Sequence, residues 1–355
     1  MVTKRHPLTR LIPWAVLLGL FGCSSAPTAP MQGDAGTGTG SNTLCGEPAP
    51  PVYDVVPIGW ASIDDLGQNG TTGGEGGEVV DVATTAEFVT ANERVEPLII
   101  QVNGTIGEGV PLVVGSHKTI LGIGPTATIY GGLEIEEVQN VIVRNLHIVG
   151  ANCMEAGVAI ECQSGDDAVG IDDGAHHVWI DHCDVRDGSD GNLDVSGAAD
   201  YVTISWTKFS YTTPEQRDHR YSNLIGGSDR STTDRGKLRV TWHHCWWAEN
   251  VVERMPRSRY GDVHVLNSYY SARRNSYCIR AGVETRILAE QNYFDRVTDP
   301  FDVESTTGVI EARDNQIIGD PVTVETGIAF TPPYAYPVDP AAEVPCAVAQ
   351  GAGPH

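Results

Sequence analysis

A short apolar pattern recurs through the middle of the chain and constrains its fold more than any other feature. In the first unit Val141 and Val143 are two positions apart, and Ile148 follows five positions later. The same pattern returns in six further units: Val178/Ile180/Val185, Val202/Ile204/Phe209, Val240/Trp242/Trp247, Val263/Val265/Tyr270, Ile287/Ala289/Phe294 and Ile310/Ala312/Ile317. Successive units begin 37, 24, 38, 23, 24 and 23 residues apart, so two of them carry insertions of about fourteen residues.

The spacing within each unit predicts strands. Residues two apart lie on one face of a strand, and the longer step to the third residue indicates a bend. Little helical periodicity follows residues 87–92. Short strands at a fixed period are typical of solenoids, so we predict an all-β protein with a parallel β-helix over residues 56–330. Residues 23–55 are rich in Gly, Thr and Pro, which predicts a flexible tether. Residues 331–355 are rich in Pro and Ala, and we expect them to form a tail without regular structure.

Charge is distributed unevenly along this predicted solenoid. The formal net charge of −23 argues against nucleic acid as a partner. Residues 161–200 contain eleven Asp or Glu and a single arginine, whereas residues 217–259 contain nine Lys or Arg against five Asp or Glu. The two insertions, 149–177 and 210–239, should rise on one side of the solenoid together with the acidic turn at 186–194. An acidic block beside a basic one suits a site that holds a cation and an anionic ligand, although an uneven surface without function gives the same pattern.

The N-terminus has the features of a targeting segment. Lys4, Arg5 and Arg10 precede an apolar run over 11–22 that is too short to span a bilayer. The run ends at Cys23 in a sequence that resembles a bacterial lipobox. We therefore expect residues 1–22 to be a signal peptide. The mature protein would be secreted or held at the outer membrane and cell surface by a lipid on Cys23, its sole membrane attachment.

Seven cysteines follow Cys23, and in an exported protein disulfides persist. An odd number leaves at least one cysteine unpaired. Two pairings are open, one closing a short loop and one tying the ends of the chain to the body: Cys153–Cys162 and Cys45–Cys346. Cys183 and Cys245 instead fall at the same position of their units as Thr207, Ser268, Asn292 and Asn315. This indicates an interior turn ladder, so we expect both to be buried free thiols.

The acidic turn contains a candidate cation site. Asp190 and Asp194 flank Gly191, and in a fully extended chain they would stand roughly 13 Å apart. Calcium–oxygen bonds run about 2.3–2.6 Å, so one ion reaches both carboxylates only if the chain folds back at Gly191. A solvated turn is the alternative, because Asp and Gly are common in turns of every kind.

Six motifs follow one another in the order seen in pectate lyases of polysaccharide lyase family 1, which the chain resembles from about Gly59 to Ile318. They are Thr72–Val79, Lys118–Gly124, Asn140–Asn145, Val178–His182, Asp190–Asp194 and Arg254–His264. The resemblance implies a right-handed β-helix. It also implies calcium-dependent β-elimination on α-1,4-polygalacturonate (pectate), which yields 4,5-unsaturated oligogalacturonides. We expect a monomer.

The resemblance also implies roles for individual acidic residues. Asp190 and Asp194 match two calcium ligands of the family, and Asp167 matches a third on the preceding coil. Asp166 is expected to assist. Ligands that are all oxygens select calcium rather than zinc or copper, which agrees with the carboxylates found here.

The arginines match the family's catalytic and substrate-binding positions. Arg254 matches the catalytic arginine and Arg259 one that binds a substrate carboxylate. Arg257 is expected to join them as a cation that binds the substrate. One position departs from the family: Tyr221 stands where a lysine is common, and we expect Arg220 to take that lysine's place.

The expected reaction needs these groups. β-Elimination removes the C5 proton next to a carboxylate, and cations on that carboxylate stabilise the charge that develops in the transition state. Arginine is ordinarily always protonated. As a base, Arg254 therefore needs a strongly cationic surrounding, and we expect an alkaline pH optimum.

The sequence leaves other functions open. A polygalacturonase-type hydrolase characteristically has a Gly-His-Gly motif, which the sequence lacks. A pectin lyase would act on methyl-esterified chains without calcium, against which Asp190 and Asp194 argue. A non-catalytic polysaccharide-binding module would bind without turnover. His182, His243 and His244 are expected to be structural. Trp242 and Trp247 fall at apolar repeat positions and are expected in the core, whereas Trp246 does not and could form a platform on which a sugar stacks.

Overall fold

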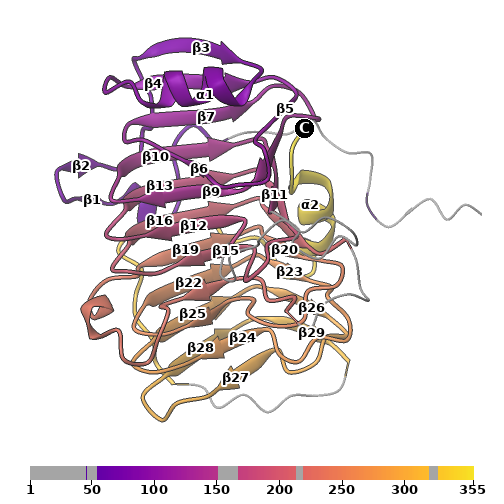
Figure 1. The fold of residues 1–355 in the computed structure, drawn as a ribbon. Coiled ribbons are helices and arrows are strands. Elements are labelled where there is room, and N and C mark those ends of the chain that lie inside the picture. The colour runs from indigo at the N-terminus through magenta and orange to yellow at the C-terminus, as the bar shows by residue number, and fades with distance from the viewer. Residues whose placement is uncertain (1–44, 46–53, 151–166, 213–218, 320–326) are drawn as a thin grey trace, which may run out of the picture. The chain divides into compact units, whose positions relative to one another are not determined.

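A computed structural model describes Cys45 and residues 54–150, 167–212, 219–319 and 327–355. Within these residues three long parallel sheets of ten, nine and eight strands run along a solenoid (Figure 1). Successive strands pass from one sheet to the next, so that β10, β11 and β12 belong to different sheets and β13 returns beside β10. The predicted all-β parallel solenoid is confirmed.

The ten-stranded sheet consists, in spatial order, of β28 (Val309–Arg313), β25 (Arg286–Glu290), β22 (Asp262–Leu266), β19 (Val240–His243), β16 (Asp200–Ser205), β13 (His176–Asp181), β10 (Gln139–Arg144), β7 (Lys118–Gly122), β4 (Leu98–Val102) and β3 (Glu78–Val82). The nine-stranded sheet consists of β29 (Gln316–Ile318), β26 (Tyr293–Asp295), β23 (Tyr269–Tyr270), β20 (Trp246–Trp247), β17 (Lys208–Ser210), β14 (Asp184–Arg186), β11 (His147–Gly150), β8 (Thr128–Gly131) and β5 (Thr105–Ile106).

The eight-stranded sheet consists of β27 (Phe301–Val303), β24 (Ile279–Ala281), β21 (Arg257–Ser258), β18 (Leu224–Ile225), β15 (Leu193–Val195), β12 (Val169–Asp172), β9 (Leu133–Glu136) and β6 (Leu112–Val113). A separate antiparallel pair is formed by β1 (Asp64–Asp65) and β2 (Gln68–Asn69). Two 3-10 turns occur at η1 (Trp60–Ser62) and η2 (Thr232–Asp234).

The sequence repeat is the stacking register of the coils. Val141 pairs with Val178, Val178 with Val202, and the column continues to Val240 and Val263. All five side chains are fully buried. Burying one such side chain contributes about 1.5–3 kcal/mol, so these columns are the main stabilising element of the solenoid.

A second repeat lies where the ten-stranded sheet turns into the nine-stranded sheet. From β10 to β28, the residue after each strand of the ten-stranded sheet has a left-handed backbone, for example His182 with φ 48° and His244 with φ 54°. The next residue faces inward, and its amide hydrogen bonds to the side chain one coil further on. Cys183 N–H donates to Thr207 Oγ1 at 3.4 Å, and Cys245 N–H donates to Ser268 Oγ at 3.2 Å. This ladder satisfies backbone donors that are buried away from water.

The predicted free thiols are confirmed: Cys183 and Cys245 are both buried and unpaired, as is Cys278. Burial raises the pKa of the Cys183 thiol to about 12, so this group stays protonated and unreactive. The Cys45–Cys346 disulfide is present. The other proposed pair, Cys153–Cys162, lies outside the described residues.

Helices are confined to the two ends of the described chain. α1 (Thr85–Asn92) packs beside β3 and β4 at the N-terminal end of the solenoid (Figure 1). Its Thr84 and Glu87 form a reciprocal capping box, which explains why the helix starts there. No helix in the described ranges is long and apolar enough to cross a membrane.

The expectation that residues 331–355 lack regular structure is wrong. They include α2 (Val344–Gly351), which begins with a proline in its first turn and buries Val344 and Val348. Proline is favoured at a helix start because its φ is already helical. The segment before it is anchored by side chains, since Asp339 pairs with His244 at 3.0 Å. The Pro- and Ala-rich composition concealed a short helix tied to the body.

Candidate active site

The outer face of the eight-stranded sheet changes from acidic to basic along the solenoid. One in-register row runs through Glu134, Gly170 and Asp194 and continues, past Leu224, through Arg257 and Arg280. The two charge blocks seen in the sequence are therefore neighbours on one surface. Such a face can hold a cation at one position and an anionic ligand at the next.

Gly191, in the acidic turn, lies close to two carboxylates. A β-carbon on this glycine would stand 2.7 Å from Asp167 Oδ1 and 2.8 Å from Asp194 Oδ1. Only a residue without a side chain leaves room for both carboxylates, which therefore converge on one point from adjacent coils. Asp194 Oδ1 also accepts a hydrogen bond from Leu224 N–H at 2.8 Å, which fixes its orientation.

The carboxyl of Asp194 has a strongly shifted pKa. The pKa of its carboxyl is raised to about 7, mainly by burial and also by the nearby charge of Asp190. The Leu224 amide and the Arg254 guanidinium act in the opposite direction. A carboxylate that is costly to ionise in the absence of a counterion is suited to binding a cation.

The remaining predicted ligands are placed less closely. Asp190 Oδ1 lies 3.0 Å from His219 Nε2, and Asp166 lies outside the described residues. Within the described ranges, no three His, Cys, Asp or Glu side chains are grouped closely enough to hold a metal ion together. The oxygen-only donors of Asp167 and Asp194 fit calcium as the start of a site. A cavity of about 140 Å³ beside them is lined by Glu134, Glu136, Asp167, Asp172, Asp194 and Ser196.

Arg254 lies against an aromatic ring instead of a carboxylate. Its guanidinium carbon stands 4.3 Å from the centroid of Tyr221. Its Nε and Nη1 atoms are buried and have no hydrogen-bond partner among the described residues. The backbone of Arg254 is left-handed, with φ 60°, at a cost on the order of 1–2 kcal/mol for a residue with a β-carbon. Strained residues of this kind cluster at functional sites.

The other two predicted arginines are tied to carboxylates. Arg259 is 8% exposed, and its Nε donates to Asp229 at 2.5 Å while Nη1 donates to the Gly226 carbonyl at 2.8 Å. Arg257 forms a forked contact from Nη2 to both carboxylate oxygens of Glu304, at 2.8 and 2.9 Å. Both guanidiniums therefore have fixed positions.

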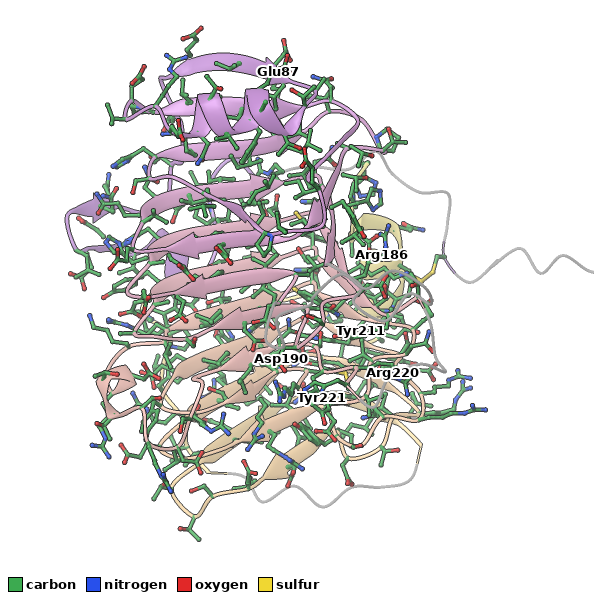
Figure 2. The ribbon with its side chains drawn as sticks, in the orientation of Figure 1. Glu87, Arg186, Asp190, Tyr211, Arg220 and Tyr221 are labelled. Carbon is green, nitrogen blue, oxygen red and sulfur yellow. A yellow bond between two sulfur atoms is a disulfide. The ribbon has the colours of Figure 1, made fainter. Side chains whose placement is uncertain are left out.

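Arg220 and Tyr221 lie on the segment that leads into β18. Figure 2 shows Asp190 and Tyr221 on the same side of the solenoid, and His219 bridges them by contacting both. The Arg220 carbonyl accepts a hydrogen bond from Val252 N–H at 2.9 Å. The role expected for the Arg220 side chain remains a prediction.

Comparison with known proteins agrees with this geometry. A sequence profile of the pectate lyase family matches residues 51–340. A pectate trisaccharide-lyase of Bacillus licheniformis is 30% identical over 362 aligned residues, covering 95% of this chain and 96% of that enzyme. This chain belongs to the pectate lyase family.

Two further members of the family are informative. A pectate trisaccharide-lyase of Thermotoga maritima is 37% identical over 221 residues, which are 61% of this chain and 57% of that enzyme. The match thus spans less than two thirds of that relative's length. A pectate lyase from a Bacillus species, solved in complex with trigalacturonate, has a TM-score of 0.70 and 28% identity, covering 84% of this chain and 98% of that one.

The histidines and tryptophans of this pectate lyase family member have structural surroundings. Trp206 stacks between His182 and His244, with ring centroids 5.7 and 4.1 Å away. Trp242 and Trp247 are fully buried in the core. Trp246 has Lys208 over one ring at 4.6 Å and Tyr269 stacked at 5.8 Å, so its faces are covered and it is a poor platform for a sugar.

Sequence reasoning missed two partners of the site. Asp229, which holds Arg259, lies 30 residues earlier in a Gly-Gly-Ser-Asp loop that resembles any solvated turn. Tyr221 was noted as a departure from the family but was given no role of its own. Its position three residues before Leu224-Ile225-Gly226, where the family commonly has a lysine, was the available signal.

Proposed function

We propose that this protein is a calcium-dependent pectate lyase that cleaves α-1,4-polygalacturonate by β-elimination. The observation that carries the proposal is the guanidinium of Arg254, whose Nε and Nη1 have no hydrogen-bond partner among the described residues, near the carboxylates of Asp167 and Asp194. A candidate cation site and an arginine with unpaired donors thus lie near each other, on a face where Arg257, Arg259 and Arg280 are each ion-paired. The trigalacturonate bound by the related Bacillus enzyme supports an oligogalacturonate as the ligand.

Asp167, Asp190 and Asp194 would hold the calcium ion, with Asp166 as a further ligand. When bound, the ion would supply positive charge to the uronate carboxylate and so make the C5 proton more acidic. Asp190 would exchange its contact with His219 for the ion. Filling this site would also compensate the buried charge of Asp194.

Arg254 would accept the C5 proton, and Arg259 and Arg257 would bind substrate carboxylates. A planar guanidinium with fixed orientation suits a carboxylate well, which agrees with the pinned geometry of Arg259. Arg220 is proposed to take the place of the family lysine. Because arginine has a pKa above about 12, the rate should rise into the alkaline range.

We further propose that the protein is exported and held at a membrane surface through Cys23, and that it acts as a monomer. Residues 1–44 lie outside the described residues, so this part rests on the sequence features of the N-terminus.

The test is turnover of polygalacturonate, followed by the ultraviolet absorbance of the unsaturated product at alkaline pH. We expect absorbance to rise with calcium and to stop with a chelator, and Asp194→Asn to need far more calcium for half-maximal rate. Reducing ends without absorbance would indicate a hydrolase. Activity on methyl-esterified pectin that survives the chelator would indicate a pectin lyase, and binding without turnover a non-catalytic module.

A further inference from the structure

The side chain of Arg254 needs a physical reason to stay in place. Arg257, Arg259 and Arg280 on the same face are each held by a carboxylate: Glu304, Asp229 and Asp302 respectively. Nε and Nη1 of Arg254 have no such partner in the described part of the chain. A long, flexible side chain without hydrogen bonds would normally sample several rotamers and lose its catalytic geometry.

The ring of Tyr221 supplies a contact of a different kind. Its centroid stands 4.3 Å from the guanidinium carbon of Arg254, well within the range of a cation–π contact. On the other partner's side, the His219 ring packs against Tyr221 with centroids 4.2 Å apart. The Tyr221 ring therefore contacts both a histidine and the arginine.

The backbones of the two residues are joined, which fixes the distance between ring and guanidinium. Tyr221 forms a parallel bridge with Glu253, and Asn223 N–H donates to the Arg254 carbonyl at 2.7 Å. The Tyr211 hydroxyl donates to the Tyr221 carbonyl at 2.6 Å. Both side chains thus rise from adjacent coils that cannot slide past one another.

An aromatic ring holds a guanidinium without using its hydrogen-bond donors. A carboxylate would accept two N–H groups and stabilise the protonated form. A ring contacts the π-face instead, so the N–H groups of the guanidinium are not engaged by an acceptor of the protein. Phenolic and indole rings do this, whereas the lysine common at this position in the family cannot.

We propose that Tyr221 is a positioning residue for Arg254: its ring fixes the guanidinium through cation–π stacking and leaves the N–H groups without a protein acceptor, so that they can act on the substrate. The proposal rests on the lyase function proposed above, because the consequence for rate is measured on that reaction. The stacking itself is independent of that function and is tested separately.

The kinetic test compares Tyr221→Phe with Tyr221→Leu, using polygalacturonate turnover with calcium at alkaline pH. Tyr221→Phe keeps the ring and should retain at least about half of kcat. Tyr221→Leu removes the ring and should lower kcat by about 10- to 100-fold with KM changed less than about threefold, because a misplacement of about 1 Å costs up to a hundredfold. Tyr293→Leu is the matched control. This tyrosine packs against Tyr269 on the nine-stranded sheet, and its loss should leave kcat and KM as in wild type.

The structural test uses the Nε–H signals of the arginines in the NMR spectrum of unligated protein, with Arg254 assigned through Arg254→Lys. The Arg254 signal should show a ring-current shift that persists in Tyr221→Phe and disappears in Tyr221→Leu. Tyr221→Met serves in place of Tyr221→Leu if the latter does not fold.

Three results would overturn the inference. One is a kcat for Tyr221→Leu within threefold of wild type; another is a loss expressed mainly in KM. The third is an equal fall in Tyr221→Phe, which would assign the role to the hydroxyl. If wild-type protein has no lyase activity but the ring-current shift follows the ring, the proposed function fails while the stacking stands.

Discussion

Arg254 and Arg259 stand five residues apart on one face and are held in opposite ways. Arg259 is almost buried, with an anionic partner in Asp229 and a backbone carbonyl in Gly226. Arg254 has a strained backbone, an aromatic partner and buried nitrogens without hydrogen bonds among the described residues. A guanidinium anchored by two acceptors still has N–H groups left to bind a carboxylate, whereas one held by a ring has no protein acceptor on its Nε and Nη1 and is suited to acting on a ligand.

The largest effect should come from Arg254→Lys. Lysine retains a positive charge but loses the planar group that lies on Tyr221, so a positioned proton acceptor is lost. We expect kcat to fall by at least about a thousandfold with little change in substrate affinity, as for an interaction made only in the transition state. Ultraviolet-monitored turnover and substrate titration give the two quantities. A variant that keeps a tenth of the rate, or that loses mainly affinity, would remove the distinction between the two arginines.

A smaller and different effect should follow from Arg259→Lys. The ammonium cannot reproduce contacts to both Asp229 and a substrate carboxylate, because it lacks the fork of the guanidinium. We expect KM to rise by about tenfold while kcat stays within a few-fold of wild type, measured in the same assay. A fall in kcat comparable to that of Arg254→Lys would mean that the two residues act as one unit.

The smallest effect concerns Asp194, the carboxylate whose pKa Arg254 lowers. A carboxyl whose folded pKa, here about 7, lies above its unfolded value of 3.8 favours the folded state at low pH. That contribution is lost as the pH rises from about 4 through 7. Without calcium, Asp194→Asn should therefore raise the melting temperature by a few degrees at pH 8 and leave it nearly unchanged at pH 4. As a control, both proteins are measured again with saturating calcium. The difference in melting temperature between Asp194→Asn and wild type at pH 8 should then shrink. An equal shift at both pH values would show that packing, and not ionisation, is responsible.

The sequence predicted the fold because the repeat is the fold: each apolar position recurs where the next coil stacks, as Val141, Val178 and Val202 show. The approach of Asp167 to Asp194 did not follow from spacing, because the glycine pattern pointed to Asp190 with Asp194, and Asp167 was expected only from the family resemblance. The turn ladder through Cys183 followed from the same register.

Other features depend on contacts that sequence spacing does not encode. The left-handed backbone of Arg254 and its stacking on Tyr221 arise from how one loop lies over the next coil. Asp229 reaches Arg259 from an exposed loop whose composition is that of any turn. α2 was missed because a helix of 8 residues in a Pro- and Ala-rich tail is stabilised by docking, not by its own periodicity.

Arg254 is proposed to face the reacting carbon while Arg259 holds a carboxylate. A crystal structure of Arg254→Lys with calcium and trigalacturonate would show both contacts, because the variant should bind the ligand without consuming it. We expect a galacturonate whose C5 faces residue 254 across the space left by the guanidinium, with a carboxylate on Arg259 and another near Asp194. A ligand whose C5 atoms all face other side chains, with residue 254 in contact only with carboxylates, would contradict it.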